Sequence, residues 1–326
     1  MPHPVPLAPR EEQDRRIAES LKRQLGEFAR FVGAPGVTDL MLNPDGCVWV
    51  HAAGRGKEMV GRMAAGAAEA FIGTVASTVR GAVTRENPIL ECELPAEPPF
   101  NGARIEALIR PVVASPSFAI RFHATRLYTL DDYVADGIMT AAQCAVLRAA
   151  VADRLNVLVS GGTASGKTTL LNAILAEMAA ACPGHRIAVI EDTSELRCHA
   201  PDAVVMRATD SVDQQRLLKA AMRLGPDRPV VGEVRGGEAL TLLKAWNTGH
   251  DGGASTLHAS GARQALERLE QLIEEVTPVP QRKRIADAVN LVVHVAKVAE
   301  APGRRVTEIV AVRGHVDGRY QFETVG

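Results

Sequence analysis

One stretch of the sequence has the residue types and spacing needed to bind a polyphosphate. Residues 161–168 read GGTASGKT and match the pattern G-x-x-x-x-G-K-[ST]. Glycines let backbone N–H groups converge on phosphate oxygens, the lysine brings positive charge to the β- and γ-phosphates, and the threonine hydroxyl ligates Mg²⁺. We therefore predict a site for ATP and Mg²⁺, with Thr168 as a metal ligand. The predicted nucleotide contacts are Gly161, Gly162, Thr163, Ala164, Ser165, Gly166, Lys167, Thr168 and Thr169.

Carboxylates follow two of the apolar runs that the sequence predicts as strands. Glu233 comes after residues 230–232, and Glu191 and Asp192 come after residues 187–190. The carboxyl ends of such strands are where α/β sheets bind ligands, and three acids beside one polyphosphate need Mg²⁺ and Lys167 to offset their charge. We predict that Glu233 orients or deprotonates the attacking water. Alternatively, Glu233 contacts Mg²⁺ through a metal-bound water. Glu191 is predicted to assist. The alternative for Glu233 is a solvated carboxylate at a strand end.

A third cluster combines glycines with two histidines. Residues 248–259 read TGHDGGASTLHA, with His250 and His258 on either side of a short apolar run. A neutral imidazole at the γ-phosphate would sense the nucleotide, and His258 is therefore a predicted catalytic residue. The alternative is a hydrogen-bonded structural histidine. A zinc pair is not favoured, because a spacing of eight with no cysteine nearby matches no common ligand pattern.

These three clusters lie in a region where strand and helix patterns alternate. Short apolar runs occur at 156–160, 187–190, 204–206 and 230–232, with helical patterns between them and at 140–153. Such alternation predicts a parallel sheet with helices on both faces, an α/β fold. The runs 291–298, 306–312 and 320–324 are predicted to add strands at one edge.

The region before it has a different pattern. Residues 11–32 predict one amphipathic helix, residues 37–51 a hairpin, and residues 66–80 a second helix. Strands are predicted at 89–94, 104–109 and 118–122, which makes this region α+β. We therefore predict two domains, residues 1–128 and 129–326, joined near 125–135.

Composition excludes several classes of protein. The 326 residues carry a formal net charge of −1 and only 4% aromatic residues, so a basic or stacking surface for nucleic acid is not predicted. The five cysteines form no C-x-x-C pair, which fits a reducing cytoplasm. The sequence shows neither a signal peptide nor a run of 18 uncharged apolar residues, so we expect a cytoplasmic protein.

Four stretches together resemble a known family. In order along the chain they read GGTASGKTT, IEDTSEL, VVGEVRGGEAL and TGHDGGASTLHA. They resemble the Walker A, Asp box, Walker B and His box of the secretion and traffic ATPases. The stretches LDDYV, KAWNTGH, LERLEQLI and DLMLNPDG are similar to the conjugal-transfer ATPases of the TrbB type, which are part of type IV secretion.

The resemblance implies more than the residues show alone. It implies a RecA-like P-loop NTPase C-terminal domain with a smaller α+β N-terminal domain. It also implies an ATP-hydrolysing homohexamer that powers pilus assembly or substrate transfer, works with inner-membrane mating-pair components and associates peripherally with the inner membrane. Direct sequence-specific nucleic-acid binding is not expected. In the family, arginines of the N-terminal domain reach the phosphates, and here Arg104 and Arg121 match those positions, with Arg110 a weaker match.

Two departures and several alternatives remain. Ala164 stands where many relatives have glycine, so a tighter loop is expected there. The tetracysteine zinc insert of many type II secretion relatives is absent, which argues against that branch. The nearest alternative is a pilus retraction or type II secretion ATPase. A nucleic-acid-stimulated RecA-like ATPase, a small-molecule kinase and a nucleotide-gated scaffold are alternatives of other classes.

Overall fold

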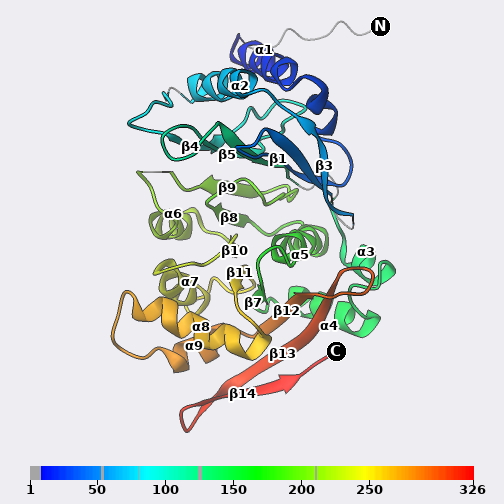
Figure 1. The fold of residues 1–326 in the computed structure, drawn as a ribbon. Coiled ribbons are helices and arrows are strands. Elements are labelled where there is room, and N and C mark those ends of the chain that lie inside the picture. Colours follow the sequence, from blue (N-terminus) through cyan, green and yellow to red (C-terminus); the bar gives the residue numbers. More distant parts are fainter. Residues whose placement is uncertain (1–8, 53–54, 80, 124–126, 210) are drawn as a thin grey trace, which may run out of the picture. The chain divides into compact units, whose positions relative to one another are not determined.

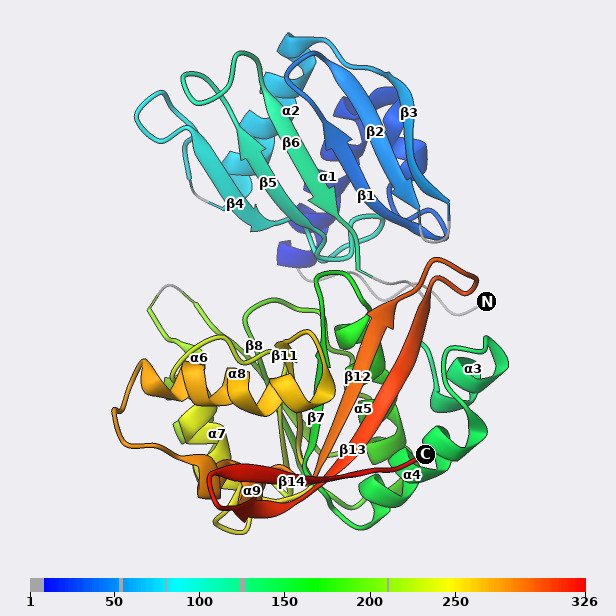
Figure 2. The same ribbon diagram turned by 60° about the horizontal axis from the view of Figure 1, so that its bottom comes forward.

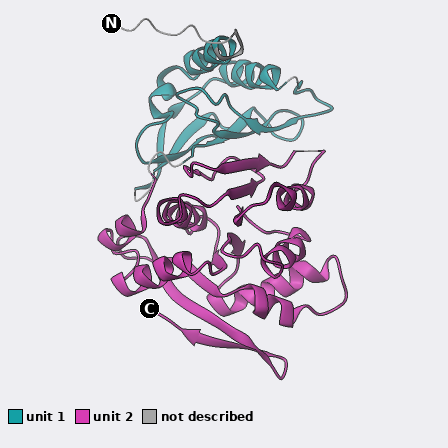
Figure 3. Cartoon of the chain, turned by 180° about the vertical axis from the view of Figure 1, so that it is seen from behind, with its two compact units in different colours: residues 1–126 teal, residues 127–326 magenta. Residues whose placement is uncertain are grey.

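The chain folds into two compact units, residues 1–126 and residues 127–326 (Figure 3). The computed structural model describes residues 9–52, 55–79, 81–123, 127–209 and 211–326. The predicted join near 125–135 therefore begins at two residues that lie outside the described part. Each unit has its own sheet and its own core, and each is described by itself below.

Unit 1 is an antiparallel sheet covered by two helices. The strand order is β3-β2-β1-β6-β5-β4. Helices α1 (Pro9–Gln24) and α2 (Ala65–Thr78) lie behind the sheet in the view of Figure 2, and α2 buries Phe71, Ile72 and Val75. The strands are β1 (Val37–Leu42), β2 (Cys47–Ala52), β3 (Gly56–Arg62), β4 (Ile89–Glu93), β5 (Arg104–Leu108) and β6 (Ser117–Arg121).

One prediction for unit 1 was wrong, and one strand was missed. The single helix predicted for residues 11–32 ends at Gln24, and a 3₁₀ helix, η1 (Gly26–Phe31), follows it. Gly26 has a φ of +57°, a left-handed conformation that cannot continue an α-helix. Strand β3 was not predicted, because its residues are mostly exposed and polar at the edge of the sheet. The predicted hairpin, second helix and three further strands are confirmed.

Unit 2 contains an eight-stranded sheet in the order β14-β13-β12-β7-β11-β10-β8-β9 (Figure 1). The six strands from β12 to β9 are parallel, and β13 and β14 add antiparallel pairs at one edge. The parallel sheet was predicted, and so were the edge strands β13 and β14. The run 291–298, predicted as a third edge strand, instead forms β12, which pairs in parallel with β7. The strands are β7 (Val157–Gly161), β8 (Ile187–Glu191), β9 (Ala203–Arg207), β10 (Arg228–Val231), β11 (Ala254–His258), β12 (Leu291–Lys297), β13 (Arg304–Val316) and β14 (Arg319–Thr324).

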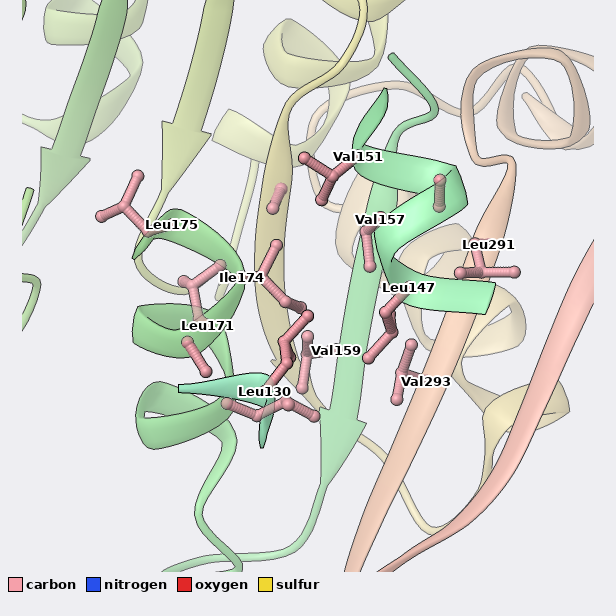
Figure 4. Packing of buried hydrophobic residues seen from close by; sticks show 14 of the residues in the cluster. Leu130, Leu147, Val151, Val157, Val159, Leu171, Ile174, Leu175, Leu291 and Val293 are labelled. Atoms are coloured by element: carbon pink, nitrogen blue, oxygen red, sulfur yellow. The ribbon is translucent and has the colours of Figure 1, made fainter. Parts of the chain in front are cut away.

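Helices cover both faces of this sheet. Successive residues of β7 point to opposite faces: Val157 and Val159 pack with Leu171 and Ile174 of α5 in one core, and Leu158 belongs to the other core (Figure 4). One face is covered by α3 (Leu130–Ala135), α4 (Ala141–Ala152) and α5 (Lys167–Ala181). The other is covered by α6 (Gln214–Ala221), the short η2 (Met222–Leu224), α7 (Glu238–Trp246), α8 (Ala262–Glu274) and α9 (Arg282–Ala288).

The order of the parallel strands brings the predicted motifs together. Because β7, β11, β10 and β8 are parallel neighbours, their carboxyl ends meet at one edge of the sheet. The residues that follow these ends include the phosphate-binding loop, Glu233 and Glu191. Within the part of the chain that the structure describes, each helix is too short or too polar to cross a bilayer.

Candidate nucleotide site

The phosphate-binding loop connects β7 to α5, and its backbone has the shape that the glycines allow. Gly166 caps α5 with a φ of +100°, and Ala164 adopts a φ of +55°. A left-handed conformation is costly for alanine, so this loop is strained where glycine would be relaxed. The first turn of α5 leaves N–H groups without helical partners and carries the positive end of the helix dipole. Thr168 and Thr169 lie in that turn and are half-buried.

Lys167 lies beneath this loop among polar partners. Only 7% of its surface is exposed, and its Nζ donates to the carbonyl of Gly162 at 3.2 Å. The same nitrogen lies 3.2 Å from Nδ1 of His258 and 3.8 Å from Oε1 of Glu233. Burial lowers the pKa of Lys167, and the positive charge of Arg235 adds to that effect, while Glu233 opposes it. An anion bound in the loop would stabilise this desolvated cation.

His258, at the end of β11, joins Lys167 to Glu233. Burial and the charge of Lys167 lower the pKa of His258, which favours the neutral imidazole. A lysine ammonium can only donate, so the His258 nitrogen that faces it must accept. His250 lies before the other end of β11, where its Nδ1 is 3.0 Å from the carbonyl oxygen of Pro226. The structure thus brings one of the two predicted histidines to the phosphate loop.

Glu233 is held by an arginine that the sequence analysis did not single out. Nε of Arg235 donates to Oε2 of Glu233 at 2.7 Å, and a terminal nitrogen of Arg235 lies 3.6 Å from Asp192. Burial alone would lower the pKa of Arg235, but its hydrogen bond to Glu233 and the surrounding carboxylates raise it. The available signal was the spacing: Arg235 follows Glu233 by two residues in VVGEVRGG.

Two buried polar atoms of the site have no hydrogen-bond partner among the described residues. One is Oε1 of Glu233, which lies 3.0 Å from Nε2 of His258 without the alignment of a hydrogen bond. The other is the hydroxyl of Ser165, a residue that is 2% exposed. Unpaired buried groups are costly, so a water or metal-bound water that donates to Oε1 of Glu233, and a phosphate oxygen that accepts from the Ser165 hydroxyl, would be favourable. The residues present therefore fit a nucleotide with Mg²⁺.

Glu191 is attached to the loop that follows it. The side chain is 3% exposed, and its Oε2 accepts hydrogen bonds from the backbone N–H groups of Glu195 and Leu196, both at 2.9 Å. Burial raises the pKa of Glu191, although the two backbone hydrogen bonds oppose the rise. Gly232 lies against it, since a Cβ built on Gly232 would be 3.3 Å from Cβ of Glu191. Glu191 therefore lies between the ends of β8 and β10.

In unit 1, two of the predicted arginines lie side by side. Arg104 of β5 is paired in register with Arg121 of β6, which sets two like charges opposite each other on one face of the sheet. Nε of Arg121 donates to Asp39 at 3.0 Å, and Arg104 lies 3.5 Å from Glu91. Hydrogen bonds from Thr38 and Arg121 lower the pKa of Asp39 against the larger single effect of burial.

Arg110 lies outside this pair. It follows the end of β5, and its Nε donates to the carbonyl of Ala114 at 2.8 Å. In the described part of the chain, no group of three or more His, Cys, Asp or Glu side chains is arranged to hold a metal ion.

Comparisons with known proteins identify the family of this chain. The family described as type II/IV secretion system protein matches residues 59–314. The chain is 47% identical over 310 residues to a protein described as probable conjugal transfer protein TrbB from Sinorhizobium fredii, covering 95% of this chain and 94% of that one. It is also 47% identical to the conjugal transfer protein TrbB of Rhizobium radiobacter, covering 94% of each chain.

A solved structure supports the architecture. The pilus retraction motor PilT with bound ADP superposes with a TM-score of 0.64 at 20% identity, covering 92% of this chain and 82% of that chain. This likeness shows the fold alone: a RecA-like ATPase domain preceded by a smaller α+β domain, as the sequence resemblance implied. The chain belongs to the type II/IV secretion system protein family, among relatives of the conjugal transfer protein TrbB.

Proposed function

We propose that this protein is an ATP-hydrolysing ring motor of a conjugative type IV secretion system. The observation that carries the proposal is the joining of Lys167, His258 and Glu233 at the phosphate-binding loop of a chain 47% identical to TrbB proteins. Phosphoryl transfer needs mainly positioned charges, and this cluster supplies them. The relatives named for conjugal transfer favour that role over pilus retraction, since the PilT likeness concerns the fold.

The proposed roles follow from the contacts. Lys167 offsets the charge of the β- and γ-phosphates, and neutral His258 reports the state of the γ-phosphate to Glu233. Glu233 orients the attacking water through its unpaired Oε1, with Arg235 fixing the carboxylate from the other oxygen. Glu191 assists by holding the loop after β8 and by accepting a proton, which its raised pKa favours.

Magnesium would be held at the first turn of α5. Thr168 would ligate it through the hydroxyl, and Glu233 would contact its shell through a water. When bound, Mg²⁺ would neutralise charge on the β- and γ-phosphate oxygens. Gly161 to Thr169 would supply the backbone donors for the phosphates.

Arg104 and Arg121 are proposed to offset the charge that develops on the transferred phosphoryl group. Their adjacency on β5 and β6 is the supporting observation, because it places two guanidinium groups on one face of the sheet, where they could bind the same phosphoryl group. Asp39 would hold Arg121 in position through its hydrogen bond. We further propose the homohexamer implied by the family, located in the cytoplasm and attached peripherally to inner-membrane mating-pair components.

Paired glutamine variants test this assignment. Glu233→Gln is expected to lower kcat for Mg-ATP by about 10²–10³-fold while ATP still binds, and Glu191→Gln by about tenfold. The matched control Glu267→Gln changes an exposed α8 carboxylate and should leave kcat unchanged. If Glu191→Gln abolished turnover while Glu233→Gln left it intact, Glu191 would be the principal residue.

A second experiment separates the alternatives. In a donor strain that lacks its own TrbB, this chain should restore conjugal transfer, and the Glu233→Gln variant should not. Hydrolysis that rises strongly with added single-stranded DNA and falls steeply with salt would instead favour the nucleic-acid-stimulated ATPase.

A further inference from the structure

A hairpin far along the chain lies beside the phosphate-binding loop. Strand β12 is a parallel neighbour of β7, with His294 in register with Ser160, so its carboxyl end reaches the edge of the sheet where that loop begins. Strand β13 returns antiparallel from the same edge, and its first residue, Arg304, is in register with Lys297. Figure 2 shows the β12–β13 connection at the end of the sheet toward which β7 runs.

The side chain of Arg304 packs against the loop itself. A Cβ built on Gly166 would lie 2.9 Å from a terminal nitrogen of Arg304 and 3.4 Å from its Cδ. Strand alternation explains the direction, because Arg304 shares a face with Val306, which belongs to the same core as α5. The next residue, Arg305, is exposed on the opposite face. Arg304 therefore borders the N-terminus of α5.

This position is unfavourable for a cation unless an anion is present. The N-terminus of a helix is positive, and a guanidinium beside Gly166 is repelled by it. The side chain of Arg304 makes no ion pair or hydrogen bond with another described residue, in contrast to that of Arg235, which is bound to Glu233. The hydroxyl of Ser165 in the same loop is buried and unpartnered, and it lies where a Cβ on Gly161 would be 2.5 Å away. Both features point to a bound anion.

The two flanks of the loop differ in which part of a nucleotide they can serve. His258 and Glu233 lie on the flank of β11 and β10, where the proposed hydrolysis takes place. Arg304 lies on the opposite flank, beyond β12. We propose that Arg304 is a nucleotide-binding residue that contacts the α-phosphate of a bound nucleoside di- or triphosphate. The proposal rests on the proposed function and extends it to the nucleoside end of the same ligand.

A guanidinium suits this task because its planar fork can donate two parallel hydrogen bonds to two phosphate oxygens. A residue bound to the α-phosphate contacts ADP and ATP alike. Its loss should weaken both ligands by the same factor and raise KM while kcat stays nearly constant.

The test compares ADP with inorganic phosphate, a ligand that can fill one phosphate position of the loop but has no α-phosphate, by titration calorimetry on the full chain. Arg304→Ala is expected to weaken ADP binding about tenfold and to change the affinity for inorganic phosphate less than about twofold. Arg304→Lys should recover part of the ADP affinity. Arg305→Ala, the matched neighbour on the opposite face, should bind both ligands like the wild type, and the melting temperatures without ligand should agree.

Each other result overturns the inference in a recognisable way. Unchanged ADP affinity in Arg304→Ala would mean that Arg304 does not contact the nucleotide. Equal losses for ADP and inorganic phosphate would mean that it acts on the loop or on a phosphate other than the α-phosphate. Failure of the wild type to bind either ligand would refute the proposed function and this inference with it.

Discussion

Among the described residues of unit 2, two buried cations lie at opposite ends of the sheet, and their hydrogen-bond partners differ. At the carboxyl edge, Lys167 lies beside carboxylates in a site with unpaired polar atoms. At the amino end of β10, Arg228 is completely buried. Its nitrogens donate to Nδ1 of His185 at 3.0 Å, to the carbonyl of Gly252 at 3.0 Å and to the carbonyl of Val151 at 2.8 Å.

The hydrogen-bond partners of a buried cation indicate whether it has a structural or a functional role. The contacts of Arg228 are neutral acceptors already in place, and one of its terminal nitrogens also approaches the Cys182 sulfur at 3.2 Å. That arrangement fixes neighbouring segments and leaves little for a ligand to do. Lys167 instead lies beside Oε1 of Glu233 and in the same loop as Ser165, both of which have unpartnered atoms, so a ligand can still add contacts at this site. Removing Lys167 should therefore lower activity with little effect on stability, and removing Arg228 should lower stability with little effect on activity.

The largest effect is expected for Lys167→Ala. Hydrolysis of Mg-ATP should fall by about 10³-fold or more, because the charge facing the phosphates is lost. Folding stability should hardly change, since burial already disfavours the lysine charge, as its lowered pKa indicates. Turnover assays and thermal melting check both parts. The exposed Lys283→Ala is the control, and near-normal turnover in Lys167→Ala would remove the phosphate loop from the mechanism.

Arg228→Met should show the reverse pattern. It leaves buried carbonyls and His185 without their donor, which we expect to cost about 3 kcal/mol and to lower the melting temperature by about 6–12 °C. At a temperature where the variant is folded, kcat should stay near the wild-type value. The matched surface change Arg223→Met should leave both quantities unchanged. A loss of kcat without a loss of stability would contradict the structural role.

Protonation of His258 is expected to lower the rate of ATP hydrolysis at acidic pH, which gives the rate profile an acid limb. Burial and Lys167 hold its pKa below 6.5, so the ring is neutral near pH 7 and gains a proton only as the pH falls through that lowered pKa. Protonation puts a second positive charge beside Lys167, with Arg235 and Arg268 adding repulsion and Glu233 opposing it. Turnover should then fall with a limiting slope of about tenfold per pH unit.

In His258→Gln the side chain cannot be protonated, so this limb should be missing from the rate profile. The comparison uses initial rates of both proteins from pH 7.5 to 5.5 at saturating Mg-ATP. An unchanged limb in the variant would assign it to another group, such as Glu191, whose pKa is raised.

The smallest effect is expected at Ala164. Its left-handed φ of +55° costs alanine about 1 kcal/mol, whereas glycine adopts it freely. Ala164→Gly also makes the unfolded chain more flexible, which offsets part of the gain. A rise of about 1–2 °C in melting temperature is expected for a unit of this size. A clear drop would mean that the methyl group makes a favourable contact in the loop.

The sequence predicted the residues at the carboxyl edge of the unit 2 sheet better than the residues that hold them in place. The glycines, Lys167, Glu233 and His258 belong to contiguous motifs, and the alternation of strands with helices predicted that these motifs would meet. A role for Arg235 could have been predicted from the same motif, because it stands two residues after Glu233. Arg304 was not, because its closeness to Gly166 depends on the order of β12 and β13 in the sheet.

Local patterns also failed where one residue decided the backbone. The apolar spacing of residues 11–32 continues across Gly26, so periodicity alone cannot reveal the break that its positive φ produces. Short α3 begins with a capping box in which Thr129 and Asp132 bond each other reciprocally. That signal was present in the sequence, but the helix spans only residues 130–135 and has too few turns for a periodic pattern.

The most direct test of the account is the rate of Mg-ATP hydrolysis per subunit as the protein concentration is raised, with Lys167→Ala as the blank. The account predicts a specific rate that climbs steeply and then saturates, because the ring must assemble before each site is complete. Sizing at each concentration should show the ring forming over the same range. A substantial rate that stays flat while sizing shows monomers would contradict the ring motor and favour a P-loop enzyme that works alone.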